Sequence, residues 1–116
     1  MPYIVDGQSV EVSQEPQNKE GTLFVPLRGL SAAVGGTVDW DPDSRVANVY
    51  HKDRIVHVTP GDTTVSVDGE QTELQAAPYL EEGDTWVPVR FFNQPLGYQL
   101  NVDTATNQVE LTTWNG

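Results

Sequence analysis

The sequence contains no cysteine, few basic residues and no long apolar run, and each of these absences excludes a class of protein. Without cysteine the chain has no disulfide bond, thiolate metal site or cysteine nucleophile, although its compartment stays open. Only 6 lysines and arginines stand against 17 aspartates and glutamates, so the net charge is -11. This charge repels phosphate backbones and anionic lipids. We therefore expect no nucleic-acid partner.

No apolar segment reaches the roughly 18 residues that span a bilayer. The N-terminus, Met1-Pro2-Tyr3-Ile4, has no basic region before an apolar stretch, so we expect no signal peptide and no membrane insertion. Two origins stay open: a protein that has no leader, or a domain cut from a longer exported chain.

A repeated motif is the main positive feature of the chain. Val25-Pro26-Leu27-Arg28 returns as Val87-Pro88-Val89-Arg90, an offset of 62 residues (25 + 62 = 87). Sliding residues 3–52 onto 65–114 without a gap gives 12 identities, at Val5, Asp6, Gly7, Glu11, Pro16, Glu20, Gly21, Val25, Pro26, Arg28, Gly35 and Asp41. Each copy alone would bury too little surface to be stable. We therefore expect one domain, 1–116, in which repeats 3–52 and 65–114 share a core and 53–64 is a connecting strand and turn.

Both copies show the same order of predicted elements. A hairpin around Asp-Gly is followed by a polar stretch, a short apolar strand, a helix beginning at the proline, and a closing hairpin. In the first copy these are 3–12, 13–21, 23–25, 27–34 and 37–50; in the second the hairpins are 64–74 and 99–112. Pro95 falls where Ala33 stood, which predicts a shorter or irregular second helix. The fold class is α+β: two pseudo-repeats of antiparallel strands with one short helix each.

The string from Val25 to Asp41, with V-P-[LV]-R followed by glycine and aspartate in both copies, resembles the copper amine oxidase N-terminal domain, or stalk domain. The resemblance implies an accessory module, found as the stem of some bacterial amine oxidases and in exported proteins of Gram-positive bacteria. Those proteins include cell-wall hydrolases and phage lysins. It also implies an extracellular or cell-envelope location, and it places copper and the quinone cofactor in a separate catalytic domain.

The residues agree with that separation. A copper site of this kind takes three histidines, and the chain has His51 and His57. None of its four tyrosines has the Asn-Tyr-Asp/Glu context of the quinone precursor, and no serine lies in a G-X-S-X-G elbow. We expect no enzyme activity, no metal and no cofactor.

Asp39, Asp41 and Asp43 alternate like the beginning of a calcium loop. Ser44 and Tyr50 stand where such a loop needs glycine and glutamate, so turn formation is the favoured interpretation. Whether the three aspartates bind a cation stays open.

The repeated polar residues are predicted to be structural. Arg28 and Arg90 begin their helices, where the helix dipole disfavours a cation, so we expect both to be partly buried and paired with a repeated carboxylate, Asp41/Asp103 or Glu20/Glu82. A ligand-binding pair of arginines is the alternative. The full structural set is Arg28, Arg90, Asp41, Asp103, Pro26, Pro88, Gly35 and Gly97.

Aromatic residues decide between a scaffold and a sugar-binding module. Trp40 and Trp86 align with Val102 and Phe24, which predicts core positions for both. Trp114 and Tyr98 are the candidates for ligand contact, and a sugar platform normally has at least two exposed coplanar rings. Together with the family resemblance, which implies a stalk or accessory role, this favours a non-catalytic stalk or scaffold/attachment domain of a larger cell-envelope or phage-associated protein, with other domains or subunits as partners. The alternative is a module that binds peptidoglycan or another wall polysaccharide.

Overall fold

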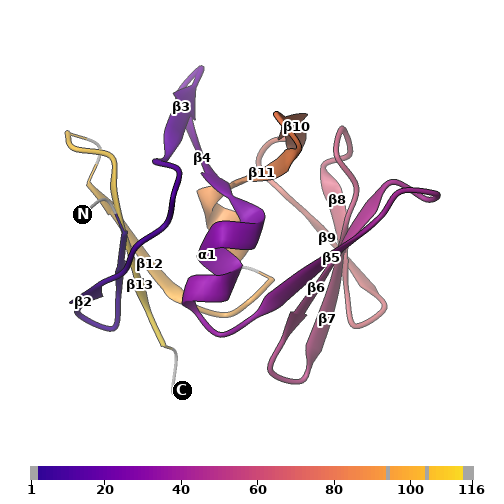
Figure 1. The fold of residues 1–116 in the computed structure, drawn as a ribbon, viewed down its shortest axis with the longest axis horizontal. Helices are drawn as coiled ribbons and strands as arrows, with labels where there is room; N and C mark the ends of the chain where they lie inside the picture. Colours follow the sequence, from indigo (N-terminus) through magenta and orange to yellow (C-terminus); the bar gives the residue numbers. More distant parts are fainter. Residues whose placement is uncertain (1–2, 94, 104, 114–116) are drawn as a thin grey trace.

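The computed structural model describes residues 3–93, 95–103 and 105–113, which form three β-sheets around a short helix (Figure 1). Sheet A has the strand order β12 (Gln99–Asp103), β13 (Gln108–Thr112), β1 (Tyr3–Val5), β2 (Gln8–Ser9). Sheet B has the order β10 (Tyr79–Glu81), β11 (Asp84–Pro88), β4 (Thr22–Pro26), β3 (Gln17–Lys19). Sheet C has the order β5 (Thr37–Asp41), β6 (Val46–His51), β7 (Arg54–Val58), β8 (Thr64–Val67), β9 (Glu70–Glu73).

Each strand of the β4 and β11 pair ends at a proline that begins a helical turn. Pro26 has no N–H to donate to a neighbouring strand, and α1 (Leu27–Ala33) follows it directly. After Pro88 only a 3-10 turn forms, η1 (Val89–Phe92). The prediction of a shorter second helix is confirmed, and Pro95 lies beyond the end of η1.

Within the described residues, the fold is a compact, mostly-β domain with one short α-helix, and the helical segment of the second half is the 3-10 turn η1. Two strands, β3 and β10, form within the segments predicted only as polar stretches, 13–21 and, 62 residues later, 75–83. Neither has the alternating apolar pattern that would reveal it, because both lie at the edges of sheet B. The sequence predicted antiparallel strands alone, whereas β1 and β13 form a parallel pair.

Strands from the two halves of the chain are interleaved. In sheet B, β4 pairs with β11 about Val25 and Val87, which lie opposite each other. In sheet A, β1 lies beside β13, whereas in sheet C the connecting strand β7 lies between β6 and β8. Buried residues from both halves form one core cluster that includes Val25, Leu27 and Phe91.

Figure 1 shows α1 in the middle of the molecule, with sheet A on one side and sheet C on the other. In this view β4 of sheet B leads into the top of α1, and its partner β11 lies next to it. Within the described residues, no helix has the length and apolar character needed to cross a membrane.

Candidate functional site

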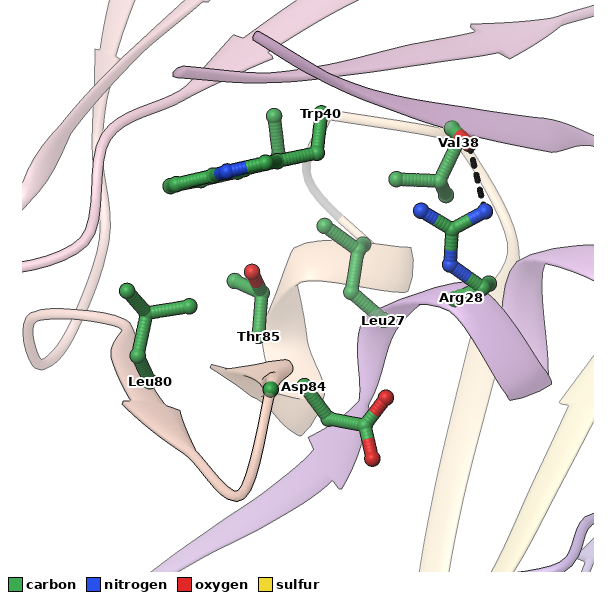
Figure 2. Close-up of a pocket in the computed structure, with 9 residues that line it drawn as sticks. Leu27, Arg28, Val38, Trp40, Leu80, Asp84 and Thr85 are labelled. Carbon is green, nitrogen blue, oxygen red and sulfur yellow. Dashed lines mark hydrogen bonds between the residues drawn. The ribbon is translucent and has the colours of Figure 1, made fainter. Parts of the chain in front are cut away.

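A cavity of about 280 Å³ opens between β5, the first turn of α1 and the hairpin formed by β10 and β11. We call it the Trp40 cleft (Figure 2). Trp40 and Leu80 line it from opposite sides, and Leu27, Val38 and Ala47 line its apolar part. Gly83, Asp84 and Thr85 complete the lining together with Arg28.

Local structure explains why apolar side chains reach this opening. Side chains alternate along β5, so Val38 and Trp40 share the face that packs against the core while Asp39 is exposed. Both β5 and β10 are edge strands of their sheets. The cleft therefore lies between two sheet edges, where packing leaves Trp40 half-buried and Leu80 39% exposed.

Polar groups of the cleft are few and lie at its margin. The Arg28 guanidinium donates one hydrogen bond to the carbonyl oxygen of Val38, 2.9 Å away. This bond caps an edge carbonyl of β5, a position that otherwise invites pairing with another strand. The Asp84 carboxylate accepts a bond of 2.7 Å from the Gln14 side-chain amide. Figure 2 shows the Thr85 side chain on the Trp40 side of the hairpin, with its hydroxyl towards the indole.

A second cavity occupies the equivalent place in the other half of the chain. It measures about 290 Å³ and is lined by Arg90, Leu100 and Val102, which follow Arg28, Val38 and Trp40 by 62 residues (28 + 62 = 90). We call it the Arg90 cleft. Val102 stands in place of Trp40 there, and Asn18 in place of Leu80 (18 + 62 = 80), so the described residues of its lining include no aromatic ring.

The third cavity, the His51 cleft, measures about 270 Å³ and is lined by His51, Lys52, Arg54 and Tyr98 among others. His51 is buried, and its Nε2 lies 2.7 Å from the Tyr98 hydroxyl. Burial lowers the pKa of His51, and the positive charges of Lys52 and Arg54 act in the same direction. Burial has the opposite effect on Tyr98, whose charged form is the anion: it raises the pKa of that side chain. Hydrogen bonding and packing account for this cluster without a ligand.

The expectation that Arg28 and Arg90 are partly buried is wrong, because both side chains are exposed. The acids expected to pair with them serve as turn residues. Asp41 accepts hydrogen bonds from the Ser44 side chain and from the Asp43 N–H, which lower its pKa. Asp103 accepts from the Ala105 N–H in the same way.

Of the remaining members of the structural set, the two prolines precede the helical turns and Gly35 follows the C-cap of α1, whereas Gly97 lies five residues beyond the end of η1 (97 - 92 = 5). Pro26 and Pro88 are buried at the ends of β4 and β11. Gly35 and Gly97 have φ angles of 86° and 83°. This left-handed conformation is one that glycine adopts without strain.

Only part of the aromatic prediction agrees with the structure. Trp86 is buried and stacks on Tyr79 with ring centroids 6.2 Å apart. Trp40 packs against the core, as a core position predicts, but it is only partly buried and remains open to the cleft. Tyr98, a candidate for ligand contact, is 5% exposed. Trp114 lies outside the described residues.

Among the described side chains, no three acidic or histidine groups gather closely enough to hold a metal ion. Asp39 is an exposed strand residue, and Asp41 and Asp43 share a turn through a bond of 3.0 Å.

Sequence reasoning missed Leu80 and Thr85, and it gave Trp40 no functional role. One signal was available: Leu80 is an apolar residue within a segment rich in acids, and the residue 62 positions earlier is the polar Asn18. The cleft itself could not be foreseen, since it depends on β5 and β10 lying next to each other.

Comparison with known proteins gives a family and one curated relative. Residues 4–111 match the family model described as the copper amine oxidase N-terminal domain. A protein of Brevibacillus choshinensis named protease inhibitor is 29% identical to the chain over 107 residues, covering 91% of this chain and 33% of that protein. The chain therefore spans about a third of the length of that relative.

Proposed function

We propose, from the premise that the chain belongs to the copper amine oxidase N-terminal domain family, that it is a non-catalytic accessory module of a larger protein. Its role is that of a stalk or scaffold/attachment domain, in a cell-envelope or phage-associated protein outside the cell. Protease inhibition is not part of this proposal, because the chain corresponds to only 33% of the relative that has that name.

The observation that carries this proposal is the parallel pairing of β1 with β13, in which Tyr3 lies opposite Val109 and Val5 opposite Leu111. The described chain therefore enters and leaves along neighbouring strands that run in the same direction. Neighbouring domains attached before β1 and after β13 would extend from opposite ends of sheet A. Such a path suits a spacer inserted into a line of domains.

Energy transfer between two attached reporter domains tests the spacer role. The chain has no cysteine, so one cysteine on each reporter can be labelled without background. We expect a narrow distribution of distances that is unchanged when the reporters are exchanged for others. A broad distribution would contradict a rigid spacer.

Copper and amines give a test of the non-catalytic role. With two histidines in the chain, we expect no tight stoichiometric copper binding and no amine turnover. Calorimetric titration with copper, followed by an oxidase assay, measures both. Amine turnover that depends on bound copper would overturn the proposal.

The alternative function is binding of peptidoglycan or another wall polysaccharide. The Trp40 cleft favours it, because one indole is accessible beside polar groups. Co-sedimentation with purified cell walls, together with the light-scattering mass of the free chain, separates this function from a purely structural one. Saturable retention on the walls would establish the alternative.

We further propose that the module consists of two copies of one structural unit. The bounds of β4 and β11, and of β5 and β12, differ by 62 residues (22 + 62 = 84; 37 + 62 = 99), which supports the proposal. We expect the backbones of residues 3–50 and 65–112 to superpose in an experimental structure. Different folds for 25–35 and 87–97 would contradict it.

A further inference from the structure

We propose that the Trp40 cleft binds one pyranose ring of an uncharged glycan, with the sugar stacked on the Trp40 indole. This inference goes beyond the role as a spacer, which needs no ligand, and it gives the alternative function a site and a class of ligand.

The shape and polarity of the cleft match a sugar ring. A pyranose has an apolar face of C–H groups and a rim of hydroxyls, so it needs an aromatic surface with hydrogen-bonding groups at the margin. Trp40 and Leu80 supply apolar surface on two sides of a cavity of about 280 Å³. That volume lies just below the usual range for small-molecule pockets, so it suits one ring better than a long chain segment.

Hydrogen-bonding groups are available at the margin. The Thr85 hydroxyl lies on the side of the hairpin that faces the indole. One guanidinium nitrogen of Arg28 is held by Val38, which fixes the group while leaving its other N–H groups to donate. Each can pair with a ring hydroxyl.

Charge selects an uncharged glycan over an anionic one. Asp84 lines the cleft, and Glu81 and Glu82 belong to the same hairpin. Among the described residues of the lining Arg28 is the one cation, in a chain with a net charge of -11. Sugars that carry phosphate or carboxylate would be repelled.

The Arg90 cleft provides an internal comparison. It has a similar volume, an arginine at the matching position and no aromatic ring. If the indole provides the binding surface, one sugar should bind per chain. If the overall shape were sufficient, two should bind.

The experiment is a titration of the whole chain with cellotriose, maltotriose and the trimer of N-acetylglucosamine. Indole N–H signals are followed by nuclear magnetic resonance and assigned by replacing each tryptophan with phenylalanine. We expect the Trp40 signal to shift saturably with at least one trimer, with one site per chain and a dissociation constant on the order of 1 mM. The Trp86 signal, from a buried side chain, should stay in place.

Variants separate binding from folding. Trp40→Val gives the cleft the residue of its counterpart and should weaken binding at least tenfold, whereas Trp40→Phe should retain part of the affinity. Thr85→Val removes one hydroxyl and should weaken binding about threefold. This variant tests the site if Trp40→Val fails to fold. Tyr50→Ala removes a ring that is 42% exposed outside the cleft and should change nothing.

Several outcomes would overturn the inference. These are no saturable shift of Trp40 with any trimer, undiminished binding by folded Trp40→Val, or a Trp40 shift produced by a peptide or protein partner but by no sugar. None of them affects the spacer measurement, so a rigid module without sugar binding would leave the accessory role in place.

Discussion

His51 is a buried titratable side chain in a chain that carries most of its charge at the surface. The Nε2 atom lies 2.7 Å from the Tyr98 hydroxyl, and a hydrogen bond with the Val34 backbone opposes the fall of its pKa. Burial lowers the pKa, and Lys52 and Arg54 lower it further. The folded protein therefore favours the neutral imidazole.

Acidification should weaken the fold first through His51. Because the pKa is lower in the folded than in the unfolded chain, the unfolded chain binds the proton more readily. The stability is complete above the unfolded pKa, about 6.5, and falls as the pH drops below it towards the folded pKa. Urea unfolding at a series of pH values from about 8 to about 4.5, the range in which histidine titrates, measures this loss of stability.

His51→Gln is the matched variant and should flatten the stability profile in that range. Asp6 and Asp41, whose pKa values are lowered by hydrogen bonds, lose their contribution at lower pH, below about 4. Equal slopes for the variant and the parent chain would contradict the role of His51.

Arg28 should contribute little to stability, despite its recurrence at position 90. Its hydrogen bond to the Val38 carbonyl is exposed, so water can replace the guanidinium in Arg28→Ala. We expect a loss below about 1 kcal/mol in urea unfolding, and a similarly small loss for Arg90→Ala. A loss of several kcal/mol would contradict this expectation and support the partly buried ion pair that the sequence suggested.

The sequence allowed the repeated positions to be found but not their partners. Recurrence of Arg28 and Asp41 at the same offset suggested an ion pair, whereas the carboxylate of Asp41 bonds within its own turn. A short side chain such as that of aspartate forms hydrogen bonds with nearby backbone N–H groups in preference to a distant arginine. Spacing in the sequence cannot show this competition.

Strands and helical turns were more accessible to prediction than single contacts. Apolar strands β4 and β11 and the glycine that follows α1 were found because their residues leave few alternatives. Strands β3 and β10 were missed because an edge strand held by one neighbour needs no apolar pattern. Pro95 correctly indicated the weaker second helix.

Gly35 and Gly97 give a quantitative test of the element boundaries. Their φ angles are 86° and 83°, and an added Cβ would meet nothing at Gly35 and only the Arg54 guanidinium, at 3.7 Å or more, at Gly97. Replacement by alanine should therefore cost the strain of the left-handed backbone alone, about 1 to 2 kcal/mol at each site. Urea unfolding of the two variants measures it.

Asparagine tolerates this backbone better than alanine, so Gly35→Asn is the control and should cost less. Alanine variants that are as stable as the parent chain would show that the left-handed turns are not required.

Interleaving of the two halves is the property of the whole molecule that the sequence did not reveal. A repeat predicts two similar units, but it does not say which strand of one unit lies beside which strand of the other. Here β4 pairs with β11 and β1 with β13, and the connecting strand β7 enters sheet C. Such pairings join residues far apart in the chain, and no local pattern encodes them.

Cutting the chain after Gly61 tests this interdependence. The cut separates three pairs of neighbouring strands, so fragment 1–61 loses one partner each of β1, β4 and β7, and fragment 62–116 loses one each of β8, β11 and β13. Since each fragment would expose the apolar face of strands such as β4 and β11, we expect neither to show cooperative unfolding or near-ultraviolet circular dichroism alone. Mixing equal amounts should restore both signals, with the uncut chain as the control. Cooperative unfolding of fragment 62–116 by itself would mean that one unit suffices, and that the interleaved sheets add stability to a fold they do not create.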